Sequence, residues 1–318
     1  MPIPRNSFLK IVIPLLIGLI LVWYSLSKIS FSDLLNYAQG ANYWYVLIGV
    51  CLGVVSHVSR AYRWLYMAKP LGCNPRFMNS FMAVYSAYLV NLTIPRAGEV
   101  ARATILSNYE HISFEKGFGT IVAERVADTI MLMVVMGVAL SYQHDYLTSF
   151  LFERFDLKTL SVLIMIGAVF SGGIFLFIKR SGTSIAGSIR KFLKGLVEGV
   201  MSIFKMEHKW PFIAHTIFIW VMYVLMFYTT SLAISDLGGI SLGAILVGFI
   251  LASFSIAATN GGIGSFPEAV VIAFTLFGVP EDPSRAFGWI MWTAQTLVII
   301  VFGGLSLLYL PLYNRKHT

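Results

Sequence analysis

Six apolar segments of the chain are each close to the ~20 residues that an α-helix needs to cross a bilayer. They cover residues 8–28, 43–66, 116–142, 159–179, 210–234 and 285–312. With 57% hydrophobic and 12% charged residues, the sequence has too little polar surface for a soluble globule. We therefore predict an all-α polytopic membrane protein, with residues 1–318 forming a single integral membrane domain. The first segment has the layout of a signal peptide, but its length favours an uncleaved first span.

Two further segments, 79–107 and 242–279, are apolar, then broken by Gly and Pro, then apolar again. The first break carries Arg96, Glu99 and Arg102 where the chain is expected to lie in lipid. An ionised side chain at mid-bilayer costs about 2.5–3.5 kcal/mol on insertion scales, so such residues usually face protein or a wet cavity. We interpret both segments as re-entrant hairpins of two broken helices.

The distribution of Lys and Arg supports hairpins over full crossings. If both segments return to the side they came from, sixteen Lys/Arg residues gather on one side and four, namely Lys28, Arg154, Lys158 and Arg285, on the other. The positive-inside rule then places both termini in the cytoplasm, with the protein in the cell membrane. The six full spans divide into an inverted repeat, about 8–142 and 159–312, with hairpins entering from opposite faces. We predict that residues 185–205 form an amphipathic helix on the membrane surface and that residues 31–38 form a shorter one.

Charged residues in the first half form two candidate groups. On a helix starting near Pro95, Arg96, Glu99 and Arg102 form one ladder, suited to a phosphate or another anion, or to a self-neutralising ion network. In the next span, Glu124 and Asp128 share a helical face with Arg125 in reach, which suits a buried network or a site for a cation or proton.

The second span ends with Arg60 and Arg63, one turn from His57. They act either as anchors at the membrane surface or as the rim of an anion site.

In the second hairpin, the bend formed by Asn260, Gly261, Gly262 and Gly264 allows backbone N–H groups to converge on a ligand at a half-helix N-terminus. Glycines also serve close helix packing. Glu268 follows Ser265 at the spacing of a capping box, which gives it a structural alternative.

Several classes of function lack their motifs. The six histidines and two cysteines show no metal-ligand spacing, and neither a P-loop nor a catalytic triad is present. We therefore expect no metal, no cofactor and no enzymatic activity. The net charge of +8 comes from residues at the ends of apolar segments, which favours membrane anchoring over nucleic-acid binding.

Four ordered motifs resemble a known family: Arg60-x-x-Arg63-Trp64, Pro95-Arg96-x-Gly98-Glu99, Glu124-Arg125-x-x-Asp128 and Gly261-Gly262-x-Gly264-x-x-x-Glu268. Together they cover nearly the whole chain and resemble the transmembrane region of lysylphosphatidylglycerol synthetases, a flippase-like domain also found as a stand-alone membrane protein. The resemblance implies movement of an anionic or aminoacylated phospholipid, or of a polyprenyl-linked lipid, across the bilayer. The sequence contains no aminoacyl-transferase segment, so lipid aminoacylation is not expected.

We therefore expect a translocase of lipids or lipid-linked intermediates. In this hypothesis the head-group phosphate binds to arginine side chains, namely Arg96 and Arg102 with Arg60 and Arg63. The carboxylates form ion pairs, cap helices or take up protons, and they are Glu99, Glu124, Asp128 and Glu268. Arg96 and Glu268 are expected near one shared polar space. Two alternatives are a scaffold that does not transport, and an intramembrane enzyme acting on lipid phosphates with His57 or Glu124 as base.

Overall fold

The computed structural model describes residues 5–94, 96–110, 112–143, 165 and 206–315. Within these ranges the regular structure is helical and no strand occurs. The chain divides into two compact units, Met1–Glu124 with Trp210–Thr318, and Arg125–Lys209. The candidate sites below lie in the first unit, and the described part of the second consists mainly of the end of one helix.

Three described helices are long and apolar enough to span a membrane: α3 (Tyr43–Ala68, continued by a short turn to Leu71), α10 (Lys209–Ser231) and α13 (Glu281–Asn314). A fourth candidate is a pair bent by 84°, in which the Leu16–Ser27 part of α1 (Arg5–Ser27) is followed by α2 (Phe31–Gly40). The helical membrane class is therefore confirmed with three or four apolar spans. Apart from residue 165, the predicted segments 159–179 and 185–205 lie outside the described residues.

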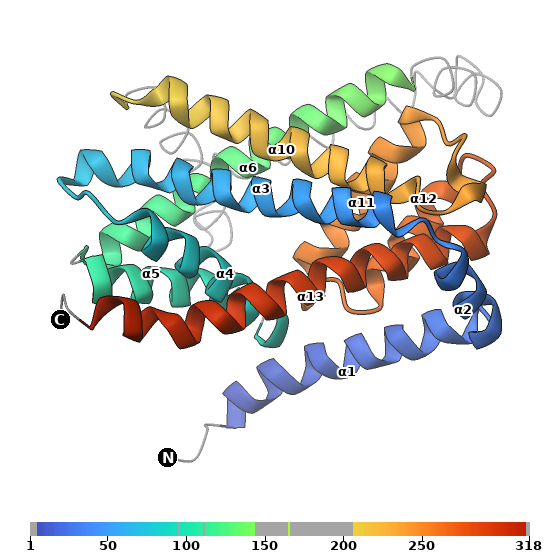
Figure 1. Cartoon of the computed structure of the whole chain (residues 1–318), viewed down its shortest axis with the longest axis horizontal. Coiled ribbons are helices and arrows are strands. Elements are labelled where there is room, and N and C mark those ends of the chain that lie inside the picture. Colours follow the sequence, from blue (N-terminus) through green and yellow to red (C-terminus); the bar gives the residue numbers. More distant parts are fainter. Residues whose placement is uncertain (1–4, 95, 111, 144–164, 166–205, 316–318) are drawn as a thin grey trace. The chain divides into compact units, whose positions relative to one another are not determined.

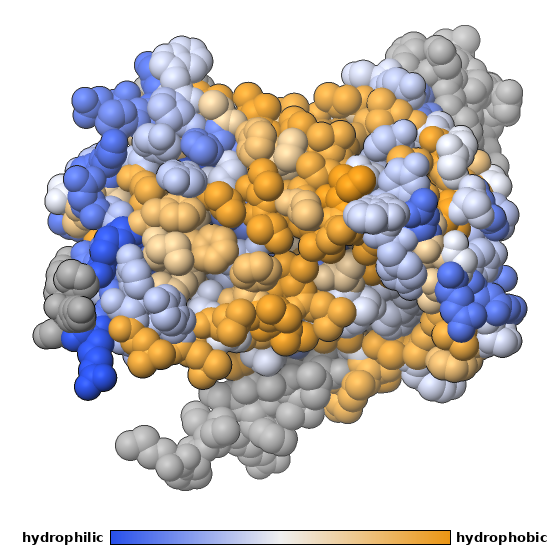
Figure 2. All heavy atoms as spheres, viewed as in Figure 1, coloured by the Kyte–Doolittle hydropathy of each residue, from blue (hydrophilic) through white to orange (hydrophobic). Residues whose placement is uncertain are grey.

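The outer faces of the long helices are apolar. On α13, exposed side chains include Leu297, Val301, Leu305 and Leu308, the last 72% exposed. Figure 2 shows hydrophobic side chains gathered over the middle of the long helices on this face and hydrophilic ones near their ends. An exposed apolar surface of this kind suits contact with lipid chains.

The first broken segment folds into a hairpin of α4 (Phe77–Thr93) and α5 (Ala97–Glu110), which pack against each other (Figure 1). At the break, Arg96 adopts a left-handed backbone conformation with φ of 61°. The side chain of Asn91 accepts a hydrogen bond of 2.7 Å from the backbone N–H of Gly98. A Cβ atom at Gly98 would overlap the carbonyl oxygen of Ala87, so glycine allows the two helices to approach closely.

The second broken segment forms a hairpin of α11 (Leu242–Ala258) and α12 (Ser265–Thr275). Between them Gly261, Gly262 and Gly264 all have positive φ, which glycine adopts without steric cost. Thr259 Oγ1 accepts a 3.1 Å hydrogen bond from the N–H of Gly262, and the indole N–H of Trp292 donates to the Gly261 carbonyl at 2.8 Å. The bend is therefore held by side chains from the hairpin and from α13.

The two hairpins start from opposite ends of the first unit. Asn79, near the start of α4, exchanges hydrogen bonds of 2.9 Å with Asn314 at the end of α13. In contrast, the short turn Ser235–Leu237, which leads into α11, lies beside Asp282 at the start of α13. The bends meet between these ends, since a Cβ atom at Gly261 would lie 2.5 Å from Leu92 Cδ2.

We expect Gly98→Ala to lower the free energy of unfolding by about 1–3 kcal/mol, because the added methyl group forces α4 and α5 apart. Gly119→Ala is the matched control, because a Cβ atom at this helical glycine meets nothing within 4 Å and alanine favours helix. Thermal unfolding of the purified proteins in detergent measures the stability of both variants relative to the wild type. Equal stability of the two variants would contradict the close approach at Gly98.

Candidate functional site

Among the described residues of the first unit, the most deeply buried carboxylate is that of Glu124, on α6 (Phe114–Tyr142), which is 0% exposed. Its Oε1 lies 2.6 Å from Arg60 Nη1 and 2.8 Å from Arg63 Nη2, and its Oε2 lies 2.8 Å from Arg102 Nη1. The three guanidinium groups are themselves almost fully buried. We call these four side chains the arginine–glutamate cluster.

Helix geometry explains how α3 contributes two arginines. Arg60 and Arg63 are three residues apart, so they lie on one face of α3 about one turn apart. Both also contact α10, through a 3.3 Å bond from Arg60 Nη2 to the hydroxyl of Tyr223 and a 3.0 Å bond from Arg63 Nη1 to Thr216 Oγ1. The cluster therefore joins α3, α5, α6 and α10.

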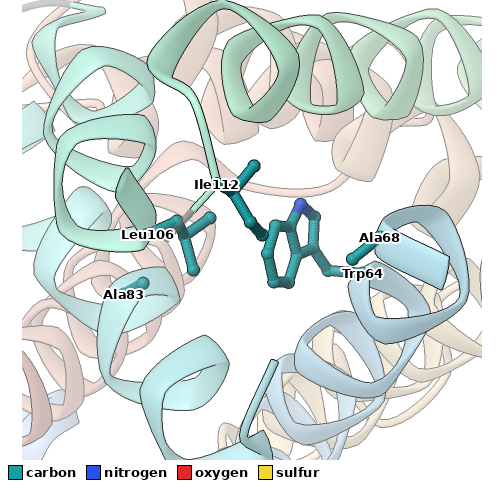
Figure 3. Packing of buried hydrophobic residues seen from close by; sticks show 5 residues of the cluster. All are labelled: Trp64, Ala68, Ala83, Leu106 and Ile112. Carbon is teal, nitrogen blue, oxygen red and sulfur yellow. The ribbon is translucent and has the colours of Figure 1, made fainter. Parts of the chain in front are cut away.

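A hydrophobic group packs directly beside the charges. It consists of Trp64 and Ala68 from α3, Ala83 from α4, Leu106 from α5, and Ile112 just before α6 (Figure 3). The indole N–H of Trp64 donates to Thr120 Oγ1 at 2.9 Å, and the guanidinium of Arg102 lies 5.9 Å from the Trp64 ring centre. This packing keeps water from that side of the cluster and adds a cation–π contact.

The arginines of the cluster are chemically suited to anions. Their three guanidinium groups converge on one carboxylate. Arginine presents planar N–H donors that match carboxylate and phosphate oxygens, so a phosphate group suits this set of side chains.

Arg96 is outside this cluster, and the predicted ladder through Arg96, Glu99 and Arg102 is wrong in this respect. Arg96 precedes the first residue of α5 and has left-handed backbone geometry, so the helical spacing does not extend to it. It is exposed, whereas Arg102 is 2% exposed. Glu99, in the first turn of α5, is half-buried.

Arg125 and Asp128 belong to the second unit. They pair with each other on α6, with 3.5 Å between Arg125 Nη1 and Asp128 Oδ2. Their side chains differ in exposure, 43% for Arg125 and 11% for Asp128.

A second charged group surrounds Arg285, which is 2% exposed. Its Nε lies 2.9 Å from Glu268 Oε1, Nη2 lies 3.1 Å from Glu281 Oε2, and Nη1 lies 3.7 Å from Asp282 Oδ1. We call these four residues the Arg285 cluster. Arg285 was missing from the sequence-based site, although carboxylates three and four residues before it signal such pairing.

The partner of Glu268 corrects two expectations. The residue before α12 is Gly264, with no side-chain cap, so Ser265 and Glu268 do not form a capping box. Among the described residues, Glu268 pairs with Arg285 and no contact joins it to Arg96. The charges therefore form two separate clusters.

The bend residues of the second hairpin serve packing as well as shape. A Cβ atom at Gly264 would lie 2.6 Å from the carbonyl carbon of Leu21 in α1, so this glycine lets the bend approach the α1 backbone. Asn260 differs from the glycines. It is 1% exposed, and neither its side-chain oxygen nor its nitrogen has a hydrogen-bond partner in the described part of the chain.

Comparison with known proteins identifies relatives. The sequence matches the family described as the lysylphosphatidylglycerol synthase TM region over residues 11–304. A UPF0104 membrane protein of Methanocaldococcus jannaschii is 24% identical over 308 residues, covering 89% of this chain and 88% of the relative. Another UPF0104 membrane protein, from Pyrococcus horikoshii, is 24% identical over 141 residues, covering 43% of this chain and 41% of the relative. The chain belongs to the family of the lysylphosphatidylglycerol synthase transmembrane region.

Proposed function

We propose that this protein moves a phosphate-bearing lipid or lipid-linked intermediate across the cell membrane without changing it chemically. The observation that carries this proposal is the fully buried Glu124 carboxylate with arginines from two other helices around it. Well-packed apolar residues would stabilise the same helices at least as well as a buried ion network. Charged side chains within a membrane protein commonly mark a substrate pathway.

The ligand class follows from the side chains. Arg60, Arg63 and Arg102 bring guanidinium groups to one point, and the head-group phosphate is what they bind in this proposal. Anionic and aminoacylated phospholipids and polyprenyl-linked lipids all carry such a phosphate. The acyl or prenyl chains remain in the surrounding lipid, against the apolar outer faces of the helices.

The arrangement of the hairpins supports transport. Many transporters place their substrate between broken helices that approach from opposite faces, within inverted repeats. In this chain the two bends meet at Gly261 and Leu92. We propose that repeats of about 8–142 and 159–312 rock around this meeting point. In this proposal the bend residues Asn260, Gly261, Gly262 and Gly264, together with Glu99, line the path.

The other charged residues have supporting parts in this proposal. Arg96, exposed at the first bend, makes the first contact with the lipid phosphate. Glu268, in the Arg285 cluster, changes its charge partner during transport in this proposal. Asp128, which pairs with Arg125, takes up and releases protons.

An intramembrane enzyme is less well supported. Both carboxylate oxygens of Glu124 already accept hydrogen bonds from arginines, which commits them to positioning guanidinium groups rather than to taking a proton from a substrate. A scaffold without transport remains the alternative that the next experiment separates from translocation.

Arg102→Gln is expected to slow lipid flipping by about 10- to 100-fold, because one charge-assisted hydrogen bond to the phosphate is worth about 1.5–3 kcal/mol. The measurement is flipping of a fluorescent phosphatidylglycerol in proteoliposomes, read by quenching from outside. Arg315→Gln is the matched control, since Arg315 is exposed after the end of α13. Wild-type flipping by a folded Arg102→Gln protein would remove Arg102 from the mechanism, whereas absence of flipping by the wild-type protein would favour the scaffold.

Glu124→Gln is expected to lower the free energy of unfolding by about 3–5 kcal/mol in neutral detergent, because three buried guanidinium groups then face an uncharged amide. Adding short-chain phosphatidylglycerol is expected to raise the melting temperature of this variant by more than it raises that of the control, Glu281→Gln. Glu281 is 62% exposed, so its ion pair contributes little. The same response to lipid in both variants would contradict anion binding at the arginine–glutamate cluster.

The proposed orientation places the end of α3 and both termini in the cytoplasm. A single cysteine at the exposed Lys69, in a Cys51→Ala, Cys73→Ala background, is therefore expected to react with a membrane-impermeant maleimide only after the cells are opened. A cysteine at the exposed Asp282, at the opposite end of the first unit, is expected to react in intact cells. The reverse pattern would overturn this orientation.

A further inference from the structure

One helical turn before Arg60, His57 of α3 lies among aromatic rings of α4 and α10. Its ring centre is 5.3 Å from that of Tyr85, 4.8 Å from that of Tyr88 and 6.0 Å from that of Tyr223. The ring of Trp220 continues the group, 6.3 Å from Tyr223. We call these five residues the His57 cluster.

The His57 cluster holds polar atoms that the protein itself does not satisfy. Within the described residues, His57 Nδ1, the Tyr85 hydroxyl and the Trp220 indole N–H are buried and have no hydrogen-bond partner. Tyr85 is 0% exposed and Trp220 is 8% exposed. Buried polar groups in native proteins are nearly always paired, so three unpaired groups on three neighbouring helices call for an explanation.

The His57 cluster is continuous with the arginine–glutamate cluster. Arg60 donates to Glu124 at 2.6 Å through Nη1 and to the hydroxyl of Tyr223 at 3.3 Å through Nη2. The His57 cluster is therefore within reach of a substituent on a phosphate that the arginines bind. Whatever that substituent is, it meets an imidazole nitrogen, a phenol and an indole N–H.

The unpaired donors of the His57 cluster select among substituents. An ammonium group has only N–H donors, so it leaves the indole N–H of Trp220 without an acceptor. Hydroxyl groups suit the His57 cluster better, because each one both donates and accepts. They can donate to the imidazole nitrogen or the phenol oxygen, and accept from the phenol or the indole N–H.

We propose that the His57 cluster is a second subsite, which binds hydroxyl groups of the substituent attached to the phosphate. The ligand is then a lipid phosphodiester with a polyol or sugar head group, rather than one whose head group is an amine. This inference rests on the proposed function, because it takes the arginine–glutamate cluster as the phosphate site.

The test compares two lipids of equal charge and similar size. Phosphatidylglycerol carries two head-group hydroxyls, whereas phosphatidylpropanol has the same number of head-group carbons and no hydroxyl. We expect short-chain phosphatidylglycerol to bind the purified protein more tightly than short-chain phosphatidylpropanol. The expected difference is about fivefold for each hydrogen bond that a head-group hydroxyl makes with the protein. Tyr85→Phe is expected to reduce this preference about fivefold while leaving the affinity for phosphatidylpropanol unchanged. Tyr62→Phe, at an exposed tyrosine of α3, is the matched control.

A stability measurement separates binding from a structural role. Tyr85→Phe removes a buried hydroxyl that has no partner, so its melting temperature is expected to equal or exceed that of the wild type. A marked loss of stability would show that the hydroxyl serves folding and would overturn the subsite.

The remaining outcomes distinguish this inference from the proposed function. Equal binding of phosphatidylglycerol and phosphatidylpropanol, or tighter binding of phosphatidylethanolamine, would overturn the subsite and leave the phosphate site intact. Binding of none of these lipids, or equal binding of the soluble head group glycerophosphoglycerol, would overturn the lipid site itself. Loss of the glycerol preference in Tyr85→Phe alone would support the subsite.

Discussion

The structure depends on compensation of one buried carboxylate by three arginines. Glu124 has no access to water, and its two oxygens receive guanidinium groups from α3 and α5. An ionised group in this position is tolerated only with such partners. The interaction fixes the position of α6 against the returning helix of the first hairpin. Through Thr216 and Tyr223 it also fixes α10. The hydrophobic group that contains Trp64 packs beside Arg102.

The Arg285 cluster has the opposite composition. One arginine near the start of α13 faces three carboxylates, whereas one carboxylate of α6 faces three arginines. The two clusters anchor hairpins that start from opposite ends of the first unit, and the bends of those hairpins meet between them. Within the described part of the chain, His57, Tyr85 and Asn260 also have buried polar side-chain atoms without a hydrogen-bond partner. For a translocase, this arrangement offers charged positions toward both ends and uncharged polar positions between them.

Local patterns were sufficient to predict a helical membrane protein with two helix pairs broken by Gly and Pro, whereas the predicted six spans compare with three or four apolar spans among the described residues. The predicted hairpins at 79–107 and 242–279 correspond to α4 with α5, over Phe77–Glu110, and to α11 with α12, over Leu242–Thr275. Apolar length and Gly/Pro breaks determine these features, and both are local. The sequence also indicated Arg102 and Glu124 as buried charges.

Tertiary pairing was the part that the sequence could not provide. Arg60 and Glu124 are 64 residues apart, so no helical spacing relates them. Arg60 and Arg63 were equally consistent with anchors at the membrane surface, and only their burial decides against that interpretation. Arg96 was misplaced because the left-handed conformation at the bend interrupts the helical spacing. Glu268 was assigned a capping alternative because its partner, Arg285, lies beyond a turn and on the next helix.

The most direct test of the phosphate site is an experimental structure of the protein in nanodiscs that contain phosphatidylglycerol. The account predicts density for a head-group phosphate in contact with the guanidinium groups of Arg60, Arg63 and Arg102. Density for lipid only on the outer apolar faces, with these arginines contacting protein groups alone, would contradict it.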